Sequence, residues 1–219
     1  SNFKEALTQI KKDFQGKLNY REITKSQYDP IAVEYRLVEN TIAQKYIYDY
    51  ELIDFIKKHG RNKNIAVLHA GSGYRSRLIK NYNVGKVIGI DLSHKQIQIA
   101  REEEIKNPNS IRYYVLDPYS DKFIDMVPKD LIGKIDIVLS FFLFDHAENK
   151  KDLENVIKNI KALLKPKGIL FGMLDHSSPA FSDPKYGVTI KFENNSKKSQ
   201  DGALRRISIY QNNLEVLHF

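Results

Sequence analysis

Apolar residues recur every three or four positions in several segments of this chain, which places them on one face of a helix. Residues 3–14 show this spacing, and a longer helical pattern begins at Pro30 and continues to about Lys58, where Gly60 provides a stop signal. The clearest pattern covers residues 149–164. Further helices are predicted at residues 74–82, 94–106 and 121–132.

Short apolar runs alternate with these helices in the middle of the chain. They predict five strands, at residues 65–68, 86–91, 111–116, 135–140 and 169–174. Strands that alternate with helices form a parallel sheet with helices on both faces. The fold class expected from this pattern is therefore α/β, with a Rossmann-like sheet.

The alternation stops after Leu174. Three antiparallel strands are predicted beyond it, at Val188–Glu193, Leu204–Tyr210 and Leu214–Phe219. We expect an N-terminal helical cap over residues 1–60 and one compact α/β domain over residues 61–219. The apolar run at the end of the chain suggests that the natural sequence continues beyond Phe219.

Composition removes several classes of protein from consideration. The 219 residues include no cysteine, which excludes disulfides, thiolate metal sites and a cysteine nucleophile. No apolar run approaches the roughly 18 residues that a membrane span needs, and no signal-peptide pattern opens the chain. We therefore expect a soluble, cytoplasmic protein without a membrane partner.

The net charge of +8 could indicate an anionic partner such as nucleic acid. However, the lysines are spread over predicted helix faces and loops, for example at Lys11, Lys80, Lys134 and Lys191, and form no compact basic and aromatic stripe. Nucleic-acid binding is therefore not expected. The sequence holds no signal for an oligomeric state.

Candidate chemistry lies where the predicted strands end. The first strand leads into Gly71 and Gly73, which allow a ligand to approach the backbone closely. Asp91 closes the second strand, 18 residues after Gly73, where a carboxylate can accept hydrogen bonds from ribose hydroxyls. Asp117 follows the third strand, near the position of an adenine edge. In the alternative interpretation, the glycines only make a tight turn and Asp91 caps the next helix.

These motifs resemble those of class I S-adenosylmethionine-dependent methyltransferases, over about residues 28–175. Val67–Gly73 is similar to the glycine-rich first motif of that family, and Asp91 in VIGIDLS and Asp117 in YYVLDPYS are similar to its two later acids. The segments DIVLSFFLF at 136–144 and ALLKPKGILFG at 162–172 continue the likeness. YDPIAVEYR at 28–36, FFLFDHAENK and DPKYGV resemble small-molecule members, particularly the toxoflavin-type group.

The resemblance implies S-adenosylmethionine as the cofactor and a small heteroaromatic or quinone-like molecule as the methyl acceptor. It assigns eleven residues to cofactor binding: Tyr28, His69, Ala70, Gly71, Gly73, Asp91, Leu92, Asp117, Pro118, Ser140 and Phe141. Tyr28 would close over the cofactor. Tyr35, Phe144 and Tyr186 would contact the acceptor.

The first motif departs from the family pattern in two positions. In the preferred alignment, the usual acid falls on Val67 and the first glycine falls on His69. An alternative alignment puts His69 at the acid and loses the last glycine at Arg75. Either way a carboxylate is missing, which would weaken cofactor binding, because one charge-assisted hydrogen bond contributes about 1.5–3 kcal/mol.

Two histidines are candidate catalytic bases. His146 follows the fourth strand and His176 follows the fifth, so both would lie at the same edge of the sheet. Asp145 and His146 could instead cap the helix that begins near Glu148. A metal site is not expected, because the six histidines form no i, i+4 pair and no cluster.

Three other functions compete with a small-molecule methyltransferase. The leading alternative is a degenerate methyltransferase fold that binds a ligand or partner without catalysis. A nucleic-acid methyltransferase is the next. Gly71, Gly73 and Ser76 also fit a dinucleotide fingerprint, but only about 45 residues follow the fifth strand, which is little for the substrate domain of a dehydrogenase.

Overall fold

A computed structural model describes the chain without interruption from Gln44 to Leu174. It also describes the single positions Asp29, Ala32, Val33, Glu39 and Thr41 and three strands nearer the C-terminus. The chain divides into two compact units. One is Gln44–His176, and the other combines Ser1–Ala43 with Ser177–Phe219. Each is described by itself below.

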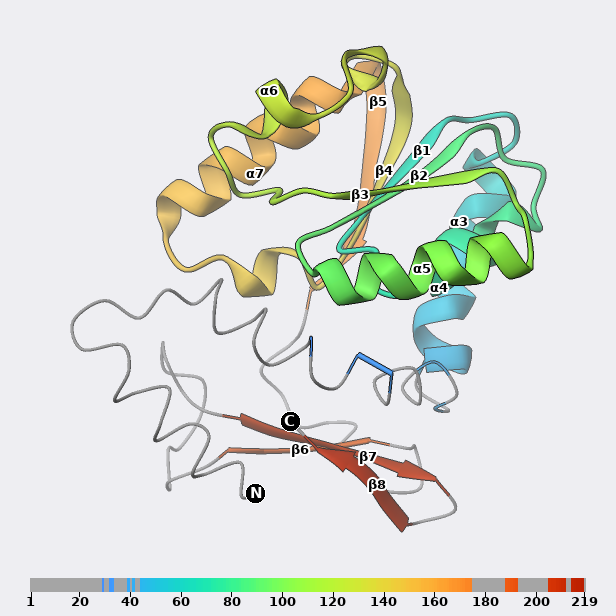
Figure 1. Ribbon diagram of the computed structural model, residues 1–219, viewed down its shortest axis with the longest axis vertical. Coiled ribbons are helices and arrows are strands. Elements are labelled where there is room, and N and C mark those ends of the chain that lie inside the picture. The colour runs from blue at the N-terminus through green and yellow to red at the C-terminus, as the bar shows by residue number, and fades with distance from the viewer. Residues whose placement is uncertain are drawn as a thin grey trace. The chain divides into compact units, whose positions relative to one another are not determined.

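The first unit is built on a parallel sheet of five strands (Figure 1). The strands are β1 (Ile65–Leu68), β2 (Val87–Asp91), β3 (Ile111–Val115), β4 (Ile135–Phe141) and β5 (Leu164–Met173). Their order across the sheet is β3-β2-β1-β4-β5, and each neighbouring pair is parallel. The prediction of a Rossmann-like sheet is confirmed. The chain order reverses between β1 and β4, which is where ligands bind in such sheets.

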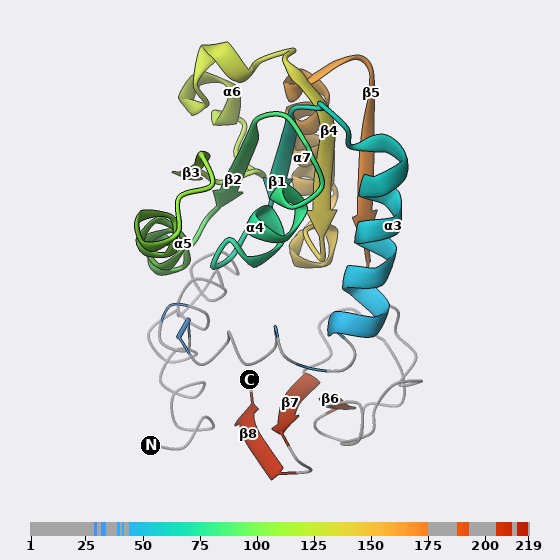
Figure 2. The same ribbon diagram turned by 90° about the vertical axis from the view of Figure 1, so that its right-hand side faces the viewer.

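Helices cover both faces of this sheet (Figure 2). One face carries α3 (Asp49–His59), α4 (Tyr74–Lys80) and α5 (His94–Lys106), and the other carries α6 (Phe123–Met126) and α7 (Lys150–Leu163). Each helix buries apolar side chains against the sheet, which stabilises the layered arrangement.

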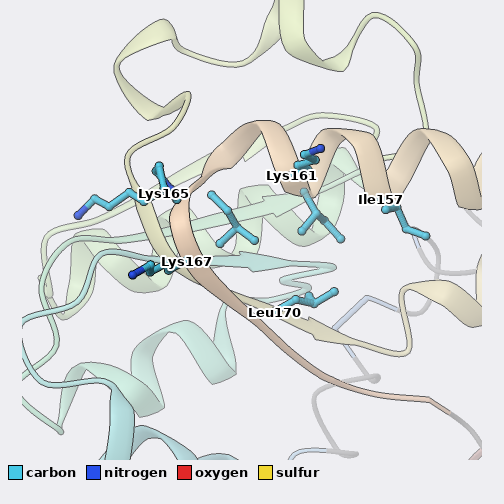
Figure 3. Close-up of a pocket in the computed structure, with 9 residues that line it drawn as sticks. Ile157, Lys161, Lys165, Lys167 and Leu170 are labelled. Carbon is cyan, nitrogen blue, oxygen red and sulfur yellow. The ribbon is translucent and has the colours of Figure 1, made fainter.

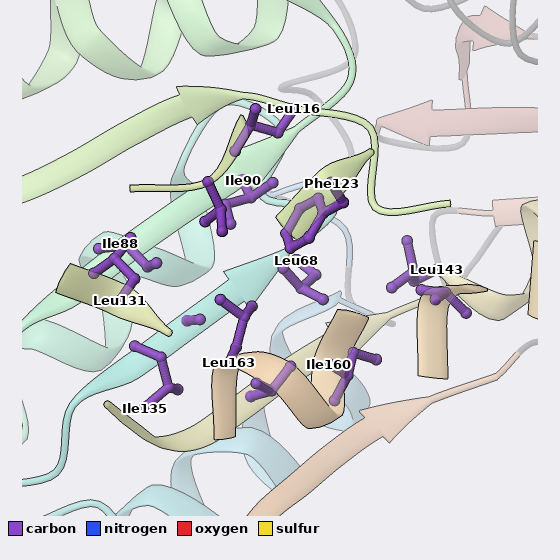
Figure 4. Close-up of a cluster of buried hydrophobic side chains, with 14 of the residues drawn as sticks. Leu68, Ile88, Ile90, Leu116, Phe123, Leu131, Ile135, Leu143, Ile160 and Leu163 are labelled. Atoms are coloured by element: carbon purple, nitrogen blue, oxygen red, sulfur yellow. The ribbon is translucent and has the colours of Figure 1, made fainter. Parts of the chain in front are cut away.

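The alternation of side chains along β1 divides the core into two clusters. Ala66 and Leu68 point toward α6 and α7, where they pack with Phe123 and Leu163 (Figure 4). Ile65 and Val67 point to the opposite face, among the residues of α3, α4 and α5. Because both sides of β1 are buried, this strand is continuously apolar rather than alternating.

The start of the first unit differs from the expected boundary at residue 60. A π-helical turn, Gln44–Tyr48, leads into α3, and Leu52 and Ile56 of α3 are buried in the second cluster. The packing of these two side chains makes α3 part of the sheet unit. The predicted helix at residues 3–14, and most of the predicted pattern between Pro30 and Gln44, lie outside the described residues.

The predicted helix at 121–132 is wrong as a single element. The structure has the short helix α6, an extended Val127 and then a 3₁₀ turn at Lys129–Leu131. Pro128 separates the two, because a residue before proline is pushed out of the helical region and proline itself has no N–H to donate.

The described strands of the second unit form a separate sheet. These are β6 (Val188–Phe192), β7 (Arg205–Gln211) and β8 (Leu214–His218), in the order β6-β7-β8, with antiparallel pairing throughout. They coincide closely with the three segments expected to be strands. In the part of the chain that the structure describes, no helix is both long and apolar enough to cross a membrane.

Candidate functional site

The carboxyl ends of the five parallel strands meet at one edge of the sheet. This carboxyl edge gathers the segments that follow β1, β2, β3 and β4, although up to about 70 residues separate them in sequence. The segments are His69–Gly73, Asp91–Ser93, Leu116–Pro118 and Phe142–His146. Every described residue that the sequence assigned to the site belongs to these segments or immediately precedes them.

The segment after β1 turns sharply. His69, Gly71 and Gly73 all have positive φ angles, of 61°, 54° and 80°. The Gly73 N–H donates to the Ala70 carbonyl, at 3.0 Å, which closes the turn. Glycine adopts these angles without strain, so the two glycines explain how a short segment, residues 69–73, connects β1 to α4.

Asp91 holds this turn in place from the end of β2. Its carboxylate is 5% exposed, and Oδ2 accepts a hydrogen bond of 2.8 Å from the Gly71 N–H. Oδ1 accepts one of 2.9 Å from the Ser93 N–H. A carboxylate has about four lone-pair sites, so both oxygens can still accept from a ligand. The alternative interpretation of Asp91 as a helix cap is wrong, because Ser93 Oγ caps α5 by accepting from the Gln96 N–H.

The two glycines have different surroundings. Among the described residues, a Cβ atom on Gly71 would meet only Gln96 Oε1, at 3.9 Å, which is an ordinary contact distance. A Cβ atom on Gly73 would lie 2.5 Å from Tyr113 Oη and 2.9 Å from Arg77 Nη1. Gly71 therefore leaves room for a ligand, whereas Gly73 leaves room for the ring of Tyr113.

Tyr113 gives a first testable prediction. Burial raises the pKa of Tyr113 to about 12, although the nearby Arg77 guanidinium opposes the rise. The unfolded chain loses this proton at its ordinary pKa of about 10, so folding stability is lost as the pH rises from 10 toward 12. Between pH 9 and pH 11, we expect the wild type to lose roughly 1–1.5 kcal/mol more unfolding free energy than Tyr113→Phe. Urea denaturation at both pH values measures this, and equal losses would contradict the assignment.

Two predicted histidines meet at this edge. The ring centroids of His69 and His146 are 4.8 Å apart, at an interplanar angle of 67°. His69 Nδ1 lies 3.3 Å from the Phe141 carbonyl oxygen, which can only accept, so Nδ1 carries the proton. The alternative role of His146 as a cap of α7 is wrong, because Asn149 caps that helix.

The structure corrects the preferred alignment of the first motif. Val67 is 1% exposed in the middle of β1, paired with Gly89 and Leu139, so an acid at this position would be buried in the apolar core. His69 is the first residue beyond the strand. This placement supports the alternative alignment, in which His69 occupies the position of the acid and Arg75 that of the last glycine.

Arg75 joins a polar network that sequence reasoning missed. Its guanidinium lies over the Phe141 ring, with Cζ 4.3 Å from the centroid, and Nη2 donates to Gln44 Oε1 at 3.0 Å. Gln44 and Tyr74 each donate to the buried Asp49, at 2.6 Å. The network ties the start of α3 to the start of α4. The two bonds that join α4 to this segment link residues 25 and 31 positions apart, so no local pattern predicts them.

The remaining residues that the sequence assigned to the site lie in or beside β2, β3 and β4, in the turn after β1, or outside the described residues. Asp117 Oδ1 accepts from the Tyr119 N–H at 2.9 Å, and the Pro118 carbonyl accepts from Asn159. Ser140 is fully buried, and Phe144 packs beside the cluster that contains Leu68. Ala70 and Leu92 belong to the turns after β1 and β2. Tyr28, Tyr35, His176 and Tyr186 lie outside the described residues.

A shallow groove of about 530 Å³ lies elsewhere, between the end of α7 and the first half of β5 (Figure 3). Ile157 and Leu170 line it, together with Lys161 and Lys167. It contains none of the predicted site residues. Among the described residues, no three His, Asp or Glu side chains are grouped so as to hold a metal ion.

Comparison with known proteins gives the family context. Residues 68–172 match a protein-family model described as a methyltransferase domain. A ubiquinone biosynthesis O-methyltransferase of Pelagibacter ubique is 33% identical over 135 residues, which is 60% of this chain and 52% of that protein. The matched part therefore spans about half the length of this curated relative.

Solved structures share the fold at low sequence identity. Phosphoethanolamine N-methyltransferase 1 of Haemonchus contortus, in complex with phosphoethanolamine and S-adenosylhomocysteine, superposes with a TM-score of 0.58. It is 17% identical, and the match covers 76% of this chain and 35% of that one. The [4+2]-cyclase SpnF superposes with a TM-score of 0.54 at 14% identity, covering 78% and 60%. The same fold thus occurs in a protein described by another activity.

The family match and the sheet order agree with the residues found at the carboxyl edge. The matched segment begins at the end of β1 and ends within β5, so it includes every described segment of the site. Residues 68–172 thus match a methyltransferase domain, and the solved structures share the fold of the first unit.

Proposed function

We propose that this chain binds S-adenosylmethionine at the carboxyl edge and transfers its methyl group to a small aromatic acceptor. The observation that carries the proposal is the pair formed by Asp91 and Gly71. A buried carboxylate at the end of β2 holds the turn after β1, and in the described part of the chain no atom comes closer than 3.9 Å to a Cβ added at Gly71. A nucleoside needs this combination, because its hydroxyls require acceptors and its ring requires room near the backbone.

The order of the strands suggests how the cofactor would lie. Asp91 would accept from the ribose hydroxyls, and Leu92, Asp117 and Pro118 after β2 and β3 would contact the adenine. The methionine end would then extend toward the ends of β1 and β4, near His69 and Ala70 after β1 and Ser140 and Phe141 in β4. Tyr28 would close over the bound cofactor.

The sulfonium supplies an activated methyl group, so the chain mainly has to align the acceptor and exclude water. We assign to His146 the removal of a proton from an acceptor hydroxyl. His176, which follows β5 in the sequence, is the second candidate for this role. The ring of His69 contacts the ring of His146, and its Nδ1–H donates a hydrogen bond to the Phe141 carbonyl. Tyr35, Phe144 and Tyr186 would contact the acceptor.

The acceptor class in the proposal is heteroaromatic or quinone-like. The name of the Pelagibacter ubique relative, a ubiquinone biosynthesis O-methyltransferase, supports an aromatic hydroxyl as the methylated group. The proposal also places the chain in the toxoflavin-type group, because of its motifs YDPIAVEYR, FFLFDHAENK and DPKYGV.

A second function is supported by a specific observation. His69 follows β1 at the position where the alternative alignment places an acid, and an imidazole lacks the negative charge with which a carboxylate attracts a cationic ligand. The chain would then bind a nucleoside ligand or a partner without transferring a methyl group.

Calorimetric titration with S-adenosylmethionine, S-adenosylhomocysteine and 5′-methylthioadenosine tests the proposal, with ATP and NADH as controls. We expect micromolar binding of S-adenosylhomocysteine and transfer of radiolabelled methyl to a catechol. Binding without transfer to any member of an aromatic acceptor panel would favour the second function. Absence of binding by a folded chain would contradict the proposed methyl transfer and would leave, of the two functions, only the binding of another ligand or a partner.

The assignment of His146 gives a separate prediction. His146→Gln should lower kcat about 100-fold or more, because general-base catalysis contributes about 10²–10⁴, while the Kd for S-adenosylhomocysteine changes less than about twofold. His94→Gln is the control, since His94 is exposed on α5. Equal rates for the two variants would exclude His146 as the base.

A further inference from the structure

Gln96 is a buried polar residue whose side-chain oxygen makes no hydrogen bond in the described part of the chain. It is 3% exposed in the first turn of α5, and its Oε1 has no hydrogen-bond partner among the described residues. Its backbone N–H already donates to Ser93 Oγ, at 3.0 Å, so the helix cap does not use the side chain. A buried acceptor without a donor costs stability, and such groups persist where a ligand or water completes them.

The position of this acceptor points to a ligand. Gln96 Oε1 is the nearest atom to the place where a side chain on Gly71 would begin, at 3.9 Å. The Gly71 N–H, on the same residue, donates to Asp91 Oδ2. The amide oxygen of Gln96 and the carboxylate of Asp91 therefore lie near the same glycine, Gly71.

Three side-chain oxygens near this glycine can accept hydrogen bonds from a ligand. Each Asp91 oxygen already accepts one backbone N–H, from Gly71 or from Ser93, and keeps one further lone pair. A ribose presents two hydroxyl donors. Gln96 Oε1 adds an acceptor with no donor of its own among the described residues.

We propose that Gln96 Oε1 accepts a hydrogen bond from a ribose hydroxyl of the cofactor, beside Asp91, and makes the site selective for ribose over deoxyribose. This inference rests on the proposed function. It assigns Gln96 a binding role, since neither the cap of α5 nor the turn after β1 uses its side-chain oxygen.

The test compares Gln96→Leu with Gln98→Leu. Gln98 lies two residues further along α5, is exposed, and bonds to Glu102 on the surface, so it is a matched control. We expect Gln96→Leu to raise the Kd for S-adenosylhomocysteine about tenfold, which corresponds to one hydrogen bond. Its melting temperature should stay the same or rise, because an apolar group replaces a buried acceptor without a donor.

Competition by nucleosides supplies a second readout. Against bound S-adenosylhomocysteine, wild type and Gln98→Leu should prefer adenosine over 2′-deoxyadenosine or 3′-deoxyadenosine, and Gln96→Leu should lose the preference for one of them. Gln96→Met, which is unbranched like glutamine, repeats the measurement if the leucine variant does not fold.

Three results would overturn the inference. One is an unchanged Kd in both Gln96 variants, and another is a Kd that rises only together with a fall in melting temperature, which would mark a structural role. A wild type that binds S-adenosylhomocysteine without any preference for ribose would also overturn it, while leaving the proposed function intact. A wild type that binds neither S-adenosylhomocysteine nor adenosine would contradict the proposed function itself, and this inference with it.

Discussion

Asp91→Asn is expected to weaken S-adenosylhomocysteine binding by about 10- to 100-fold, because a charged hydrogen bond to a ribose hydroxyl contributes about 1.5–3 kcal/mol. The substitution also replaces one accepting oxygen with an NH₂ group. That group would face the N–H of either Gly71 or Ser93, donor against donor. We therefore expect the unfolding free energy to fall by about 1–3 kcal/mol as well. Calorimetry measures the first effect and urea denaturation the second.

The control for this prediction is Asp130→Asn. Asp130 is 61% exposed, and its ion pair with Arg112 spans 3.3 Å at the surface. Exposed ion pairs contribute about 0–1 kcal/mol, so neither binding nor stability should change much. If Asp91→Asn bound S-adenosylhomocysteine within threefold of the wild type, the ribose would have to lie elsewhere.

Gly73→Ala is expected to lower the unfolding free energy by about 2–4 kcal/mol, through backbone strain and a steric clash together. Gly73 has a φ angle of 80°, which a residue with a Cβ rarely adopts. The added methyl would lie 2.5 Å from Tyr113 Oη and would force the buried ring or α4 to move. Urea denaturation of the variant measures the loss.

Gly133→Ala separates strain from clash. Gly133 has a similar φ angle of 66°, but no described atom lies within 4 Å of its added Cβ, so only the strain of about 1–2 kcal/mol remains. Tyr113→Phe removes the atom closest to the new methyl and should restore part of the stability of Gly73→Ala. Equal costs at Gly73 and Gly133 would show that the contact with Tyr113 is unimportant.

The sequence by itself determined the parallel sheet and most of its helices. The strand–helix alternation is a local signal, and so is the N-cap of α5 at Ser93, which starts that helix at His94 as predicted. The placement of Gly71, Asp91 and His146 at one edge also followed from the sequence, because parallel strands end on the same side.

Only the tertiary structure decided which atoms meet at that edge. The burial of Val67 favours the alternative alignment of the first motif, and the contact between His69 and His146 joins residues 77 positions apart. The different roles of Gly71 and Gly73 depend on Tyr113 and Gln96, which belong to other elements. Local propensity determines the period and the ends of each helix and strand. Whether a buried acceptor has a hydrogen-bond donor depends instead on side chains that folding brings together from distant parts of the chain.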